Sequence, residues 1–412
     1  MKYAKKFTAI LLALIFALSV SVTTFGATEQ NQNKYPIIFI HGMFGWGRDE
    51  GINKIAPYWG GTTGSLIKYL ENKNIEAYDV SVGPLSSAWD NACEIYAQLT
   101  GTTVDYGEAH SKAHGHDRFG RTYTEPLVPD WSEDKKVHLI GHSHGGQGAR
   151  LLAHLLTYGD KDEINATDKE NISPLFTGGK EYLVESVTTI CTPNNGTTSY
   201  NFCETFYLKP IMSFVATFYA GIVGRSFLNG ILVDFHLEHF GLTNIPGEKV
   251  SEDKLSDAID RFGNTKDAVV YDLSIEGAKS LNDKIEISEN INYFCYSYDA
   301  SGKNSKLPIN TDFFFLALTG TLLLIYGTPE DTAGIIFNDD WLSNDGLVNT
   351  VSAKNPFDEP ARDFDGKIVE GIWNVMPTRV GDHGTPIGLF SSKEEVHTFY
   401  DEMTEMLISL EK

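Results

Sequence analysis

The fold can be worked out from residues 136–156, which read KVHLIGHSHGGQGARLLAHLL. The stretch begins with an apolar run typical of a buried strand and ends with an apolar helical pattern. Between the two lies Gly-His-Ser-His-Gly at 141–145, a serine with a glycine two places to either side. A plain strand-to-helix turn needs one Asp or Gly, so a serine between two glycines requires a further explanation.

A serine in the pattern G-x-S-x-G between a strand and a helix is typical of the nucleophile elbow of α/β-hydrolases. This turn is so tight that the flanking residues must be small, and Gly141 and Gly145 meet that requirement. The hydroxyl of Ser143 would then stand at the carboxyl edge of the sheet, with the N-terminus of the helix pointing at it. The alternative is a glycine-rich turn with an incidental serine, because short motifs also match by chance.

Four other runs are rich in β-branched and aromatic residues, end in turn signals and predict buried strands. They lie at 35–42, 75–83, 182–193 and 291–300. Helical patterns lie between the strands, as at 63–72, and an amphipathic helix closes the chain at 392–412. Alternating strands and helices predict an α/β protein, here an α/β-hydrolase fold with a mostly parallel central sheet flanked by helices.

Two stretches do not fit this alternation and are interpreted as insertions. Residues 84–135 are rich in Gly, His, Asp and Tyr, and residues 200–280 begin with a run that is apolar nearly all round. Within the second insertion, residues 205–232 carry many aromatic side chains and few charges. We interpret 205–232 as a helical lid, which would expose apolar surface when displaced; an ordinary core helix is the alternative.

Composition limits the classes of protein to which the chain can belong. Its 412 residues, 42% of them hydrophobic, can form one large α/β domain with insertions or two ordinary domains. A net charge of −22 argues against nucleic acid as a partner and against electrostatic docking to anionic lipid. The four cysteines show no C-x-x-C spacing, and we interpret them as buried free thiols.

The first 27 residues follow the pattern of a secretory signal peptide. Three lysines form a basic start, residues 9–22 are apolar, and the segment ends at the small pair Gly26-Ala27. We therefore expect a secreted, extracellular protein whose mature chain, residues 28–412, is one hydrolase domain. A retained membrane anchor is the alternative, but the apolar run is short for a span, so no stable anchor is expected.

A serine hydroxyl is a poor nucleophile unless a base takes its proton. In this fold the partners follow the serine in the order acid, then histidine. His142 and His144 are neighbours of Ser143, but the elbow turns neighbouring side chains away from it, so neither should be the base. His383 lies in a loop before the closing helix and is the predicted base, whereas His397 lies inside that helix.

The residues alone leave two candidates for the acid that orients the histidine. Asp345 lies in the turn of WLSNDGLVN, and Asp299 ends a predicted strand. The acid holds the imidazole tautomer and stabilises its protonated form. Two backbone N–H groups must stabilise the oxyanion; the predicted donors are His144, which follows the nucleophile, and Met43, in the loop after an early strand.

With these residues in place, the chain resembles the secreted thermoalkaliphilic lipases of Gram-positive bacteria, the true-lipase subfamily numbered five. Matching segments include IHGMFGWGRDE, YWGGTTGSLIKYL and DDWLSNDGLVNT, and the resemblance covers essentially the whole mature chain. It implies a triacylglycerol lipase that forms an acyl-enzyme, and it selects Asp345 over Asp299. The catalytic set that it implies is Ser143, Asp345 and His383, with Met43 and His144 as oxyanion donors.

Two other functions are set against this expectation. One is a broad-specificity carboxylesterase or polyesterase that acts on short-chain or polymeric esters. The other is a secreted zinc-dependent binding protein on an inactive hydrolase scaffold, since fold alone does not imply function. For the lipase we expect a monomer that meets its lipid or ester substrate at an interface.

The resemblance also implies a structural zinc in an inserted subdomain at 84–135, with ligands at Asp90, His110, His116 and Asp267. Read without the family, the imidazoles at 110, 114 and 116 indicate a metal no more strongly than they indicate solvated loop histidines. Four nitrogen and oxygen ligands close a tetrahedral shell, so this zinc would be structural.

The chain departs from the family at its calcium site. The family places an acidic residue two positions after the catalytic histidine, where this chain has Thr385, and an Asp-Pro pair shortly beyond, where it reads PIGLFSS. A hard cation needs oxygen ligands, most of them charged. We therefore expect the calcium site to be absent or weak, which would lower thermal stability.

Overall fold

The computed structural model describes residues 32–200, 265–302 and 332–411 without gaps, and short stretches within 231–261 and 307–321. Gln32–Lys412 forms one compact unit. The expected signal peptide, 1–27, and nearly all of the expected lid, 205–232, lie outside the described residues. Among the helices that the structure describes, none combines the length and the hydropathy needed to cross a membrane.

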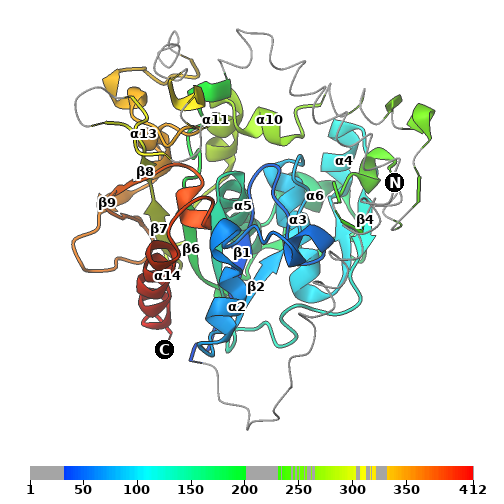
Figure 1. The fold of residues 1–412 in the computed structure, drawn as a ribbon. Coiled ribbons are helices and arrows are strands. Elements are labelled where there is room, and N and C mark those ends of the chain that lie inside the picture. Colours follow the sequence, from blue (N-terminus) through cyan, green and yellow to red (C-terminus); the bar gives the residue numbers. More distant parts are fainter. Residues whose placement is uncertain are drawn as a thin grey trace, which may run out of the picture. The chain divides into compact units, whose positions relative to one another are not determined.

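A seven-stranded sheet forms the centre of the unit, in the order β2-β1-β5-β6-β7-β10-β9, with every neighbouring pair parallel (Figure 1). Its strands are β1 Ile37–Ile40, β2 Ala77–Val80, β5 Val137–His142, β6 Val184–Ile190, β7 Asn292–Tyr296, β9 Ala361–Asp363 and β10 Trp373–Val375. All five ranges predicted as strands contain one, so the predicted fold class is confirmed. The strands β9 and β10 were not predicted, since three residues are too few to show a period.

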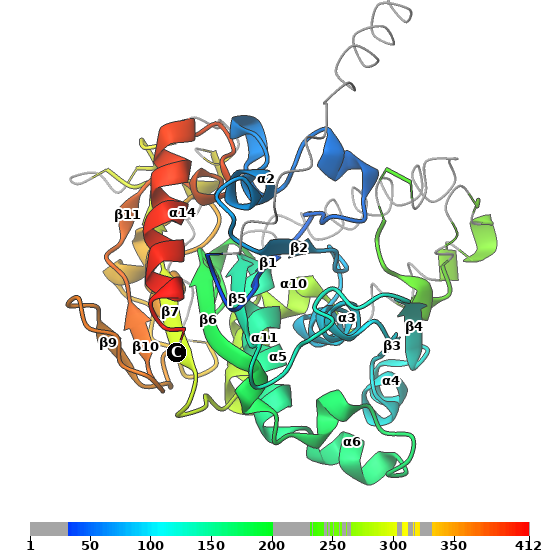
Figure 2. The ribbon, with the colours of Figure 1, turned by 90° about the horizontal axis from the view of Figure 1, so that it is seen from below.

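Helices cover both faces of the sheet (Figure 2). On one face, α3 Ala88–Thr100 and α5 His144–Tyr158 form one core cluster with the strands. On the other, α2 Leu66–Glu71 and α14 Lys393–Ile408 form a second cluster. Each fully buried Leu, Ile or Phe in these clusters contributes about 1.5–3 kcal/mol to stability.

The remaining elements are short. The helices are α4 Glu108–His114, α6 Lys161–Ala166, α10 Val269–Asp272, α11 Ile275–Lys284 and α13 Thr350–Lys354, with 3-10 turns at Gly51–Lys54, Gly61–Thr63, Pro174–Thr177, Glu181–Leu183, Glu238–Phe240, Asp339–Leu342 and Thr385–Ile387. β3 Thr103–Asp105 pairs antiparallel with β4 Phe119–Thr122, and β8 Tyr298–Asp299 pairs parallel with β11 Arg379–Val380. The range 84–135 therefore holds α3, which packs in the main core, followed by β3, α4 and β4. Cys93, Cys191 and Cys295 are buried free thiols, as predicted, and Cys203 lies outside the described residues.

The order of the strands fixes where a ligand can bind. β1 lies between β2 and β5, and the chain runs from β1 to one edge of the sheet but from β5 through β6 and β7 toward the other. In open α/β sheets, ligands bind at such a switch point, outside the carboxyl ends of the strands. The loop after β1, residues 41–50, and the turn after β5, which holds Ser143, meet there.

Candidate active site and metal site

Ser143 occupies the turn between β5 and α5 with φ 56° and ψ −132°. For a residue other than glycine, such a conformation costs about 1–3 kcal/mol and persists only where the surroundings hold it. A β-carbon on Gly141 would lie 2.4 Å from the backbone of Gly145 and Gly146, and one on Gly145 would lie 2.4 Å from the carbonyl oxygen of His41. Only glycine fits on either side of the serine, so the G-x-S-x-G pattern is a steric requirement of this turn.

Asp345 and His383 form a buried pair. The Oδ2 of Asp345 accepts a hydrogen bond from Nδ1 of His383 at 2.8 Å. The other carboxylate oxygen, Oδ1, accepts from the backbone N–H of Leu347 at 3.0 Å and of Val348 at 2.8 Å, so its own turn fixes the carboxylate. Because a carboxylate only accepts, Nδ1 carries the proton of the neutral ring and Nε2 keeps its lone pair, as a base requires.

The two competing residues lie elsewhere. Asp299, the alternative acid, accepts the backbone N–H of Ser301 at 2.8 Å. The ring of His397 in α14 stacks on Tyr69, with 3.5 Å between the ring centroids. Among the described residues, the carboxylate hydrogen-bonded to the ring of His383 is that of Asp345.

His142 ties the His383 loop to the strand that carries the serine. Its Nε2 lies 3.0 Å from the carbonyl oxygen of His383, and the two ring centroids are 4.7 Å apart. Because His142 directly precedes Ser143, this contact brings the pair of Asp345 and His383 to the elbow. The imidazole of His144 points away, with Nε2 3.2 Å from Oδ2 of Asp272.

The loop around His383 is held by its own polar groups. The carboxylate of Asp382 accepts the N–H of Gly384 at 2.9 Å and the hydroxyl of Thr311 at 2.6 Å. Thr385, two positions after His383, accepts the N–H of Asp382 on its hydroxyl at 2.9 Å. Hydrogen bonds to the carboxylate of Asp382 and to the hydroxyl of Thr385 thus fix the loop that carries the imidazole of His383.

The loop after β1 orients the N–H of Met43. Val82 donates its N–H to Nε2 of His41 at 3.3 Å, so the single proton of a neutral ring lies on Nδ1, 2.9 Å from the carbonyl oxygen of Gly42. Burial lowers the pKa of His41 to about 4, which keeps the ring neutral. The N–H of Gly45 also donates to that carbonyl, at 2.9 Å. Because the peptide is planar and trans, fixing the carbonyl of Gly42 fixes the N–H of Met43 in the opposite direction.

The second candidate donor is the N–H of His144. His144 is the first residue of α5, and the first N–H groups of a helix have no partner within it. The two loops touch, because a β-carbon on Gly42 would lie 2.6 Å from Cβ of Ser143. The structure therefore brings the Met43 loop to the serine and places His144 directly after it.

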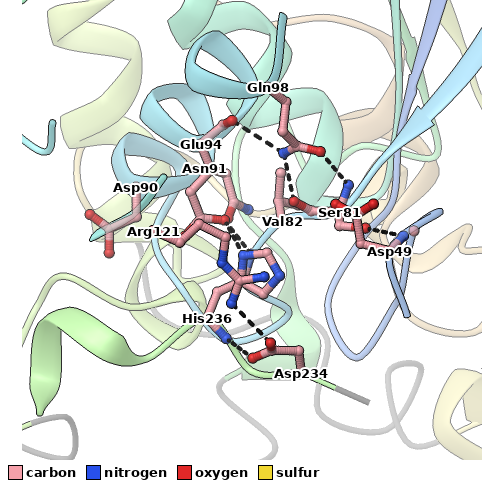
Figure 3. A network of polar contacts seen from close by, with 12 residues as sticks. Asp49, Ser81, Val82, Asp90, Asn91, Glu94, Gln98, Arg121, Asp234 and His236 are labelled. Atoms are coloured by element: carbon pink, nitrogen blue, oxygen red, sulfur yellow. Dashed lines mark hydrogen bonds and ion pairs between the residues drawn. The ribbon is translucent and has the colours of Figure 1, made fainter. Parts of the chain in front are cut away.

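A buried charged network lies behind the loop of residues 41–50 (Figure 3). His236 directs Nδ1 at Oε2 of Glu94, 3.0 Å away, and Nε2 at Oε1 of Glu50, 3.3 Å away. Glu50 ends this loop and Glu94 belongs to α3, so the network joins both to the segment around His236. Burial and Arg121 lower the pKa of His236, but Glu94 and Glu50 outweigh them and hold it well above its ordinary value.

This charged histidine predicts a pH dependence of stability. The pKa of a histidine in the unfolded chain is about 6.5. The stabilisation from charged His236 is therefore present in full below that pH, and it is lost as the pH rises through the raised pKa of the folded state. We expect His236→Gln to be less stable than the wild type at pH 6.5, and the gap in the midpoint of thermal unfolding to narrow toward pH 10. His397→Gln, at a partly exposed histidine, is the control and should show no such narrowing. A gap for His236→Gln that is constant over this range would contradict the assignment of charge.

Four buried or nearly buried side chains converge on a second site. Asp90, His110, His116 and Asp267 each offer one ligand atom, and these atoms lie within 4.8 Å of one another. Oδ2 of Asp267 is 3.0 Å from Nε2 of His110 and 3.1 Å from Nε2 of His116, and Nε2 of His110 is 3.6 Å from Oδ1 of Asp90. Ligands about 2.0–2.1 Å from a tetrahedral zinc lie roughly 3.3–3.4 Å apart, so these separations fit.

The hydrogen bonding around His116 and Asp90 also favours a cation. The Nδ1 of His116 lies 2.9 Å from the carbonyl oxygen of Asp117, which can only accept, so in a neutral ring the proton lies on Nδ1 and the lone pair on Nε2. In that form two acceptors face each other across the 3.1 Å between Nε2 of His116 and Oδ2 of Asp267. Among the described residues, neither Nε2 of His116 nor Oδ1 of Asp90 has a hydrogen-bond partner, although both atoms are buried. Each unmet atom costs about 1–3 kcal/mol, which a bound cation would offset.

Residues that the sequence analysis missed hold two of these candidate ligands in place. Nε2 of His239 lies 3.1 Å from Oδ2 of Asp90, and Glu163 accepts the backbone N–H of His110 at 2.7 Å. The ring of His114 lies beside that of His110, tilted by 38° with centroids 4.5 Å apart, and His114 is not one of the four converging residues. Such partners orient metal ligands. Neither His239 nor Glu163 lies near the ligands in the sequence, so no local pattern could have identified them.

Comparison with known proteins shows the family to which the chain belongs. The family model described as "Lipase-like, C-terminal domain" matches residues 33–412. Lipase 1 of Staphylococcus aureus is 34% identical over 397 residues, which make up 93% of this chain and 56% of that protein. The lipase of Staphylococcus hyicus is 36% identical over 398 residues, 93% of this chain and 59% of that protein. The chain thus spans less than two thirds of the length of these relatives.

Solved structures show the same similarity in three dimensions. The crystal structure of Staphylococcus hyicus lipase has a TM-score of 0.77 at 33% identity, covering 94% of this chain and 99% of that one. The structure of EstA from Clostridium botulinum has a TM-score of 0.75 at 33% identity, covering 96% and 92% of the two chains.

Proposed function

Because this chain belongs to the family described as "Lipase-like, C-terminal domain", within the α/β-hydrolase fold, we propose that it is a secreted triacylglycerol lipase that hydrolyses carboxylic esters. The observation that carries the proposal is the hydrogen bond of 2.8 Å between Asp345 and His383. The contact of His142 with the backbone of His383 brings this pair to the strained elbow of Ser143. That arrangement supplies a nucleophile, a base and a group that orients the base.

The proposed mechanism uses five residues. Oγ of Ser143 attacks the ester carbonyl carbon while Nε2 of His383 takes its proton, and the protonated ring then gives that proton to the departing alcohol. Water, deprotonated by His383, attacks the acyl-enzyme and releases the fatty acid and the free serine. Asp345 holds the tautomer and stabilises the charged ring. The N–H groups of Met43 and His144 stabilise the oxyanion, each by about 3 kcal/mol.

The length of the acyl chain distinguishes a lipase from a broad-specificity carboxylesterase or polyesterase. Rates on p-nitrophenyl esters from acetate to stearate, and on triacylglycerol above and below the concentration at which it forms an emulsion, test the proposal. A lipase whose residues 205–232 act as a lid should retain high rates on long chains and should accelerate when the emulsion forms. Activity confined to short chains, with no such acceleration, would favour the esterase.

We further propose that Asp90, His110, His116 and Asp267 hold a structural zinc. The support is the unmet Nε2 of His116 and Oδ1 of Asp90 in a donor set of two imidazoles and two carboxylates. When bound, zinc would satisfy these atoms and join α3 and α4 to the segment before α10. Four protein ligands leave no open position, so the ion would take no part in the chemistry.

Loss of this zinc should reduce stability. We expect about one zinc per purified chain, and a chelator should lower the midpoint of thermal unfolding by several degrees, since binding to the folded state alone stabilises it. His116→Ala should lose the metal, whereas His114→Ala, the matched control, should keep it. Added calcium should leave the midpoint unchanged, as Thr385 predicts. A wild-type protein without zinc, or equal loss from both variants, would contradict the assignment.

Secretion is part of the same proposal. Residues 1–27 have the basic start, the apolar run and the small-residue end of a signal peptide. Protein recovered from the culture medium should therefore begin at Thr28 and sediment as a monomer. Extracellular protein that still carries residues 1–27 would contradict cleavage.

A further inference from the structure

A buried chain of hydrogen bonds joins the loop of residues 41–50, which carries the candidate oxyanion donor Met43, to the candidate base His383. The N–H of Gly42 donates to Oη of Tyr58 at 3.0 Å, Oη lies 2.7 Å from Nδ1 of His142, and Nε2 of His142 lies 3.0 Å from the carbonyl oxygen of His383. Tyr58, His142 and His383 are 8%, 1% and 7% exposed. Water therefore has little access to these hydrogen bonds, and a lost partner would not readily be replaced.

The two ends of the chain of hydrogen bonds force one arrangement of protons. The carbonyl oxygen of His383 can only accept, so Nε2 of His142 carries a proton. Burial and the neighbouring His383 hold the pKa of His142 well below its usual value, so the ring is neutral and Nδ1 has none. Nδ1 must then accept from the hydroxyl of Tyr58, whose oxygen accepts the N–H of Gly42.

We propose that Tyr58 and His142 are positioning residues, which hold the oxyanion peptide and the catalytic imidazole in register with each other. The inference rests on the proposed function. It deepens that function by naming two residues that act on the reaction without touching the substrate.

The contacts at each end show what is being positioned. At one end, Tyr58 holds the N–H of Gly42 while His41 and Gly45 hold its carbonyl, so both peptides that flank Gly42 are fixed. The second of these peptides carries the N–H of Met43. A donor aimed at an oxyanion acts only near its ideal distance, so a small shift of this peptide lowers the rate without unfolding the protein.

At the other end, the backbone of His383 is held from two sides. Its N–H donates to the carbonyl oxygen of Asp345 at 2.8 Å, and its own carbonyl accepts from His142. The Asp345 side chain orients the ring. Loss of the contact with His142 would let the backbone of His383 shift while its ring stayed hydrogen-bonded to the carboxylate of Asp345. A displacement of about 1 Å can cost a hundredfold in rate.

The first test is Tyr58→Phe, which removes Oη and keeps the ring. The matched control is Tyr400→Phe in the same core cluster, because the hydroxyl of Tyr400 is buried and has no partner among the described residues. At a temperature where all variants are folded, we expect Tyr58→Phe to lower kcat on a p-nitrophenyl ester about ten- to a hundredfold with little change in KM. Tyr400→Phe should retain the wild-type kcat.

A second measurement separates positioning from a purely structural role. An alkylboronic acid forms a tetrahedral adduct with a serine hydroxyl and so mimics the oxyanion. Its inhibition constant should rise in Tyr58→Phe by the same factor by which kcat/KM falls. A purely structural hydroxyl would lower the unfolding midpoint and leave kcat and the inhibition constant of the folded enzyme unchanged, and that result would overturn the proposal.

The link between Tyr58 and His142 can be tested by combining substitutions. The side-chain amide of Gln can still donate to the carbonyl of His383, but it offers no acceptor at the place of Nδ1. We expect His142→Gln to match Tyr58→Phe, and the double variant to be no slower than the slower single one, because both break the same hydrogen bond. Multiplied losses in the double variant would overturn the link.

The proposed function and this inference fail in different ways. A zinc-loaded wild type without esterase activity would overturn both. An active wild type with an equally active Tyr58→Phe would overturn the inference alone.

Discussion

Replacing Ser143 with alanine should lower kcat for ester hydrolysis by about 10⁴-fold or more, without loss of folded or zinc-loaded protein. The substitution removes the only atom in the proposed mechanism that bonds to the acyl group. Alanine keeps the β-carbon that lies beside Gly42, so the packing of the two loops should be unchanged. Initial rates on a p-nitrophenyl ester, with metal content and unfolding midpoint measured on the same samples, give the result.

The matched control for this substitution is Ser288→Ala. Ser288 lies in the loop after α11 and is 1% exposed, and its hydroxyl donates to the carboxylate of Glu181. Its loss should cost some stability but leave kcat unchanged. If Ser143→Ala retained more than a small fraction of the wild-type rate, another group would have to be the nucleophile. Activity of the wild type would in either case exclude an inactive scaffold that only binds zinc.

Asp345→Asn should have an effect of similar size, a loss of about 10⁴-fold in kcat, for a reason that can be read from its contacts. Oδ1 of Asp345 accepts two backbone N–H groups, from Leu347 and Val348. The amide oxygen of asparagine would take that place, which turns its NH₂ group toward Nδ1 of His383. The imidazole must then accept at Nδ1 and carry its proton on Nε2, where it can no longer act as a base.

Asp299→Asn is the control, because Asp299 was the other acid that the sequence allowed. Its carboxylate accepts the N–H of Ser301, a role that an amide oxygen can also fill. We expect kcat within about twofold of the wild type, because the substitution leaves the hydrogen bond between Asp345 and His383 in place. If the two variants exchanged their effects, Asp299 would be the acid and the hydrogen bond of Asp345 a structural one.

Most of the sheet could be predicted from the sequence because buried parallel strands carry continuous apolar runs. Every strand of four or more residues in the main sheet lies within a range predicted from such a run. The strands β9 and β10 escaped because each has three residues and gains its stability from pairing, which a local pattern does not record. Helix α3 likewise lies in a stretch interpreted as an insertion, although its side chains pack in the main core.

The site shows the same division between local and distant information. The elbow could be predicted because the tight turn around Ser143 leaves no room for a β-carbon at Gly141 or Gly145, and all three residues lie within five positions of sequence. The acid could not be chosen from the residues alone; a resemblance to a known family selected Asp345 over Asp299. Tyr58 and His142 lie 84 positions apart, and no spacing rule connects a phenol to an imidazole at that distance.

The central claim is that Ser143 is a nucleophile activated by the pair of His383 and Asp345. Its most direct test is peptide mass spectrometry after treatment with an alkyl fluorophosphonate, which bonds covalently to an activated serine. The account predicts one adduct, on the peptide that contains Ser143, formed rapidly in the wild type and very slowly in Asp345→Asn. An adduct on another residue, or equal labelling of Ser143 in both proteins, would contradict it.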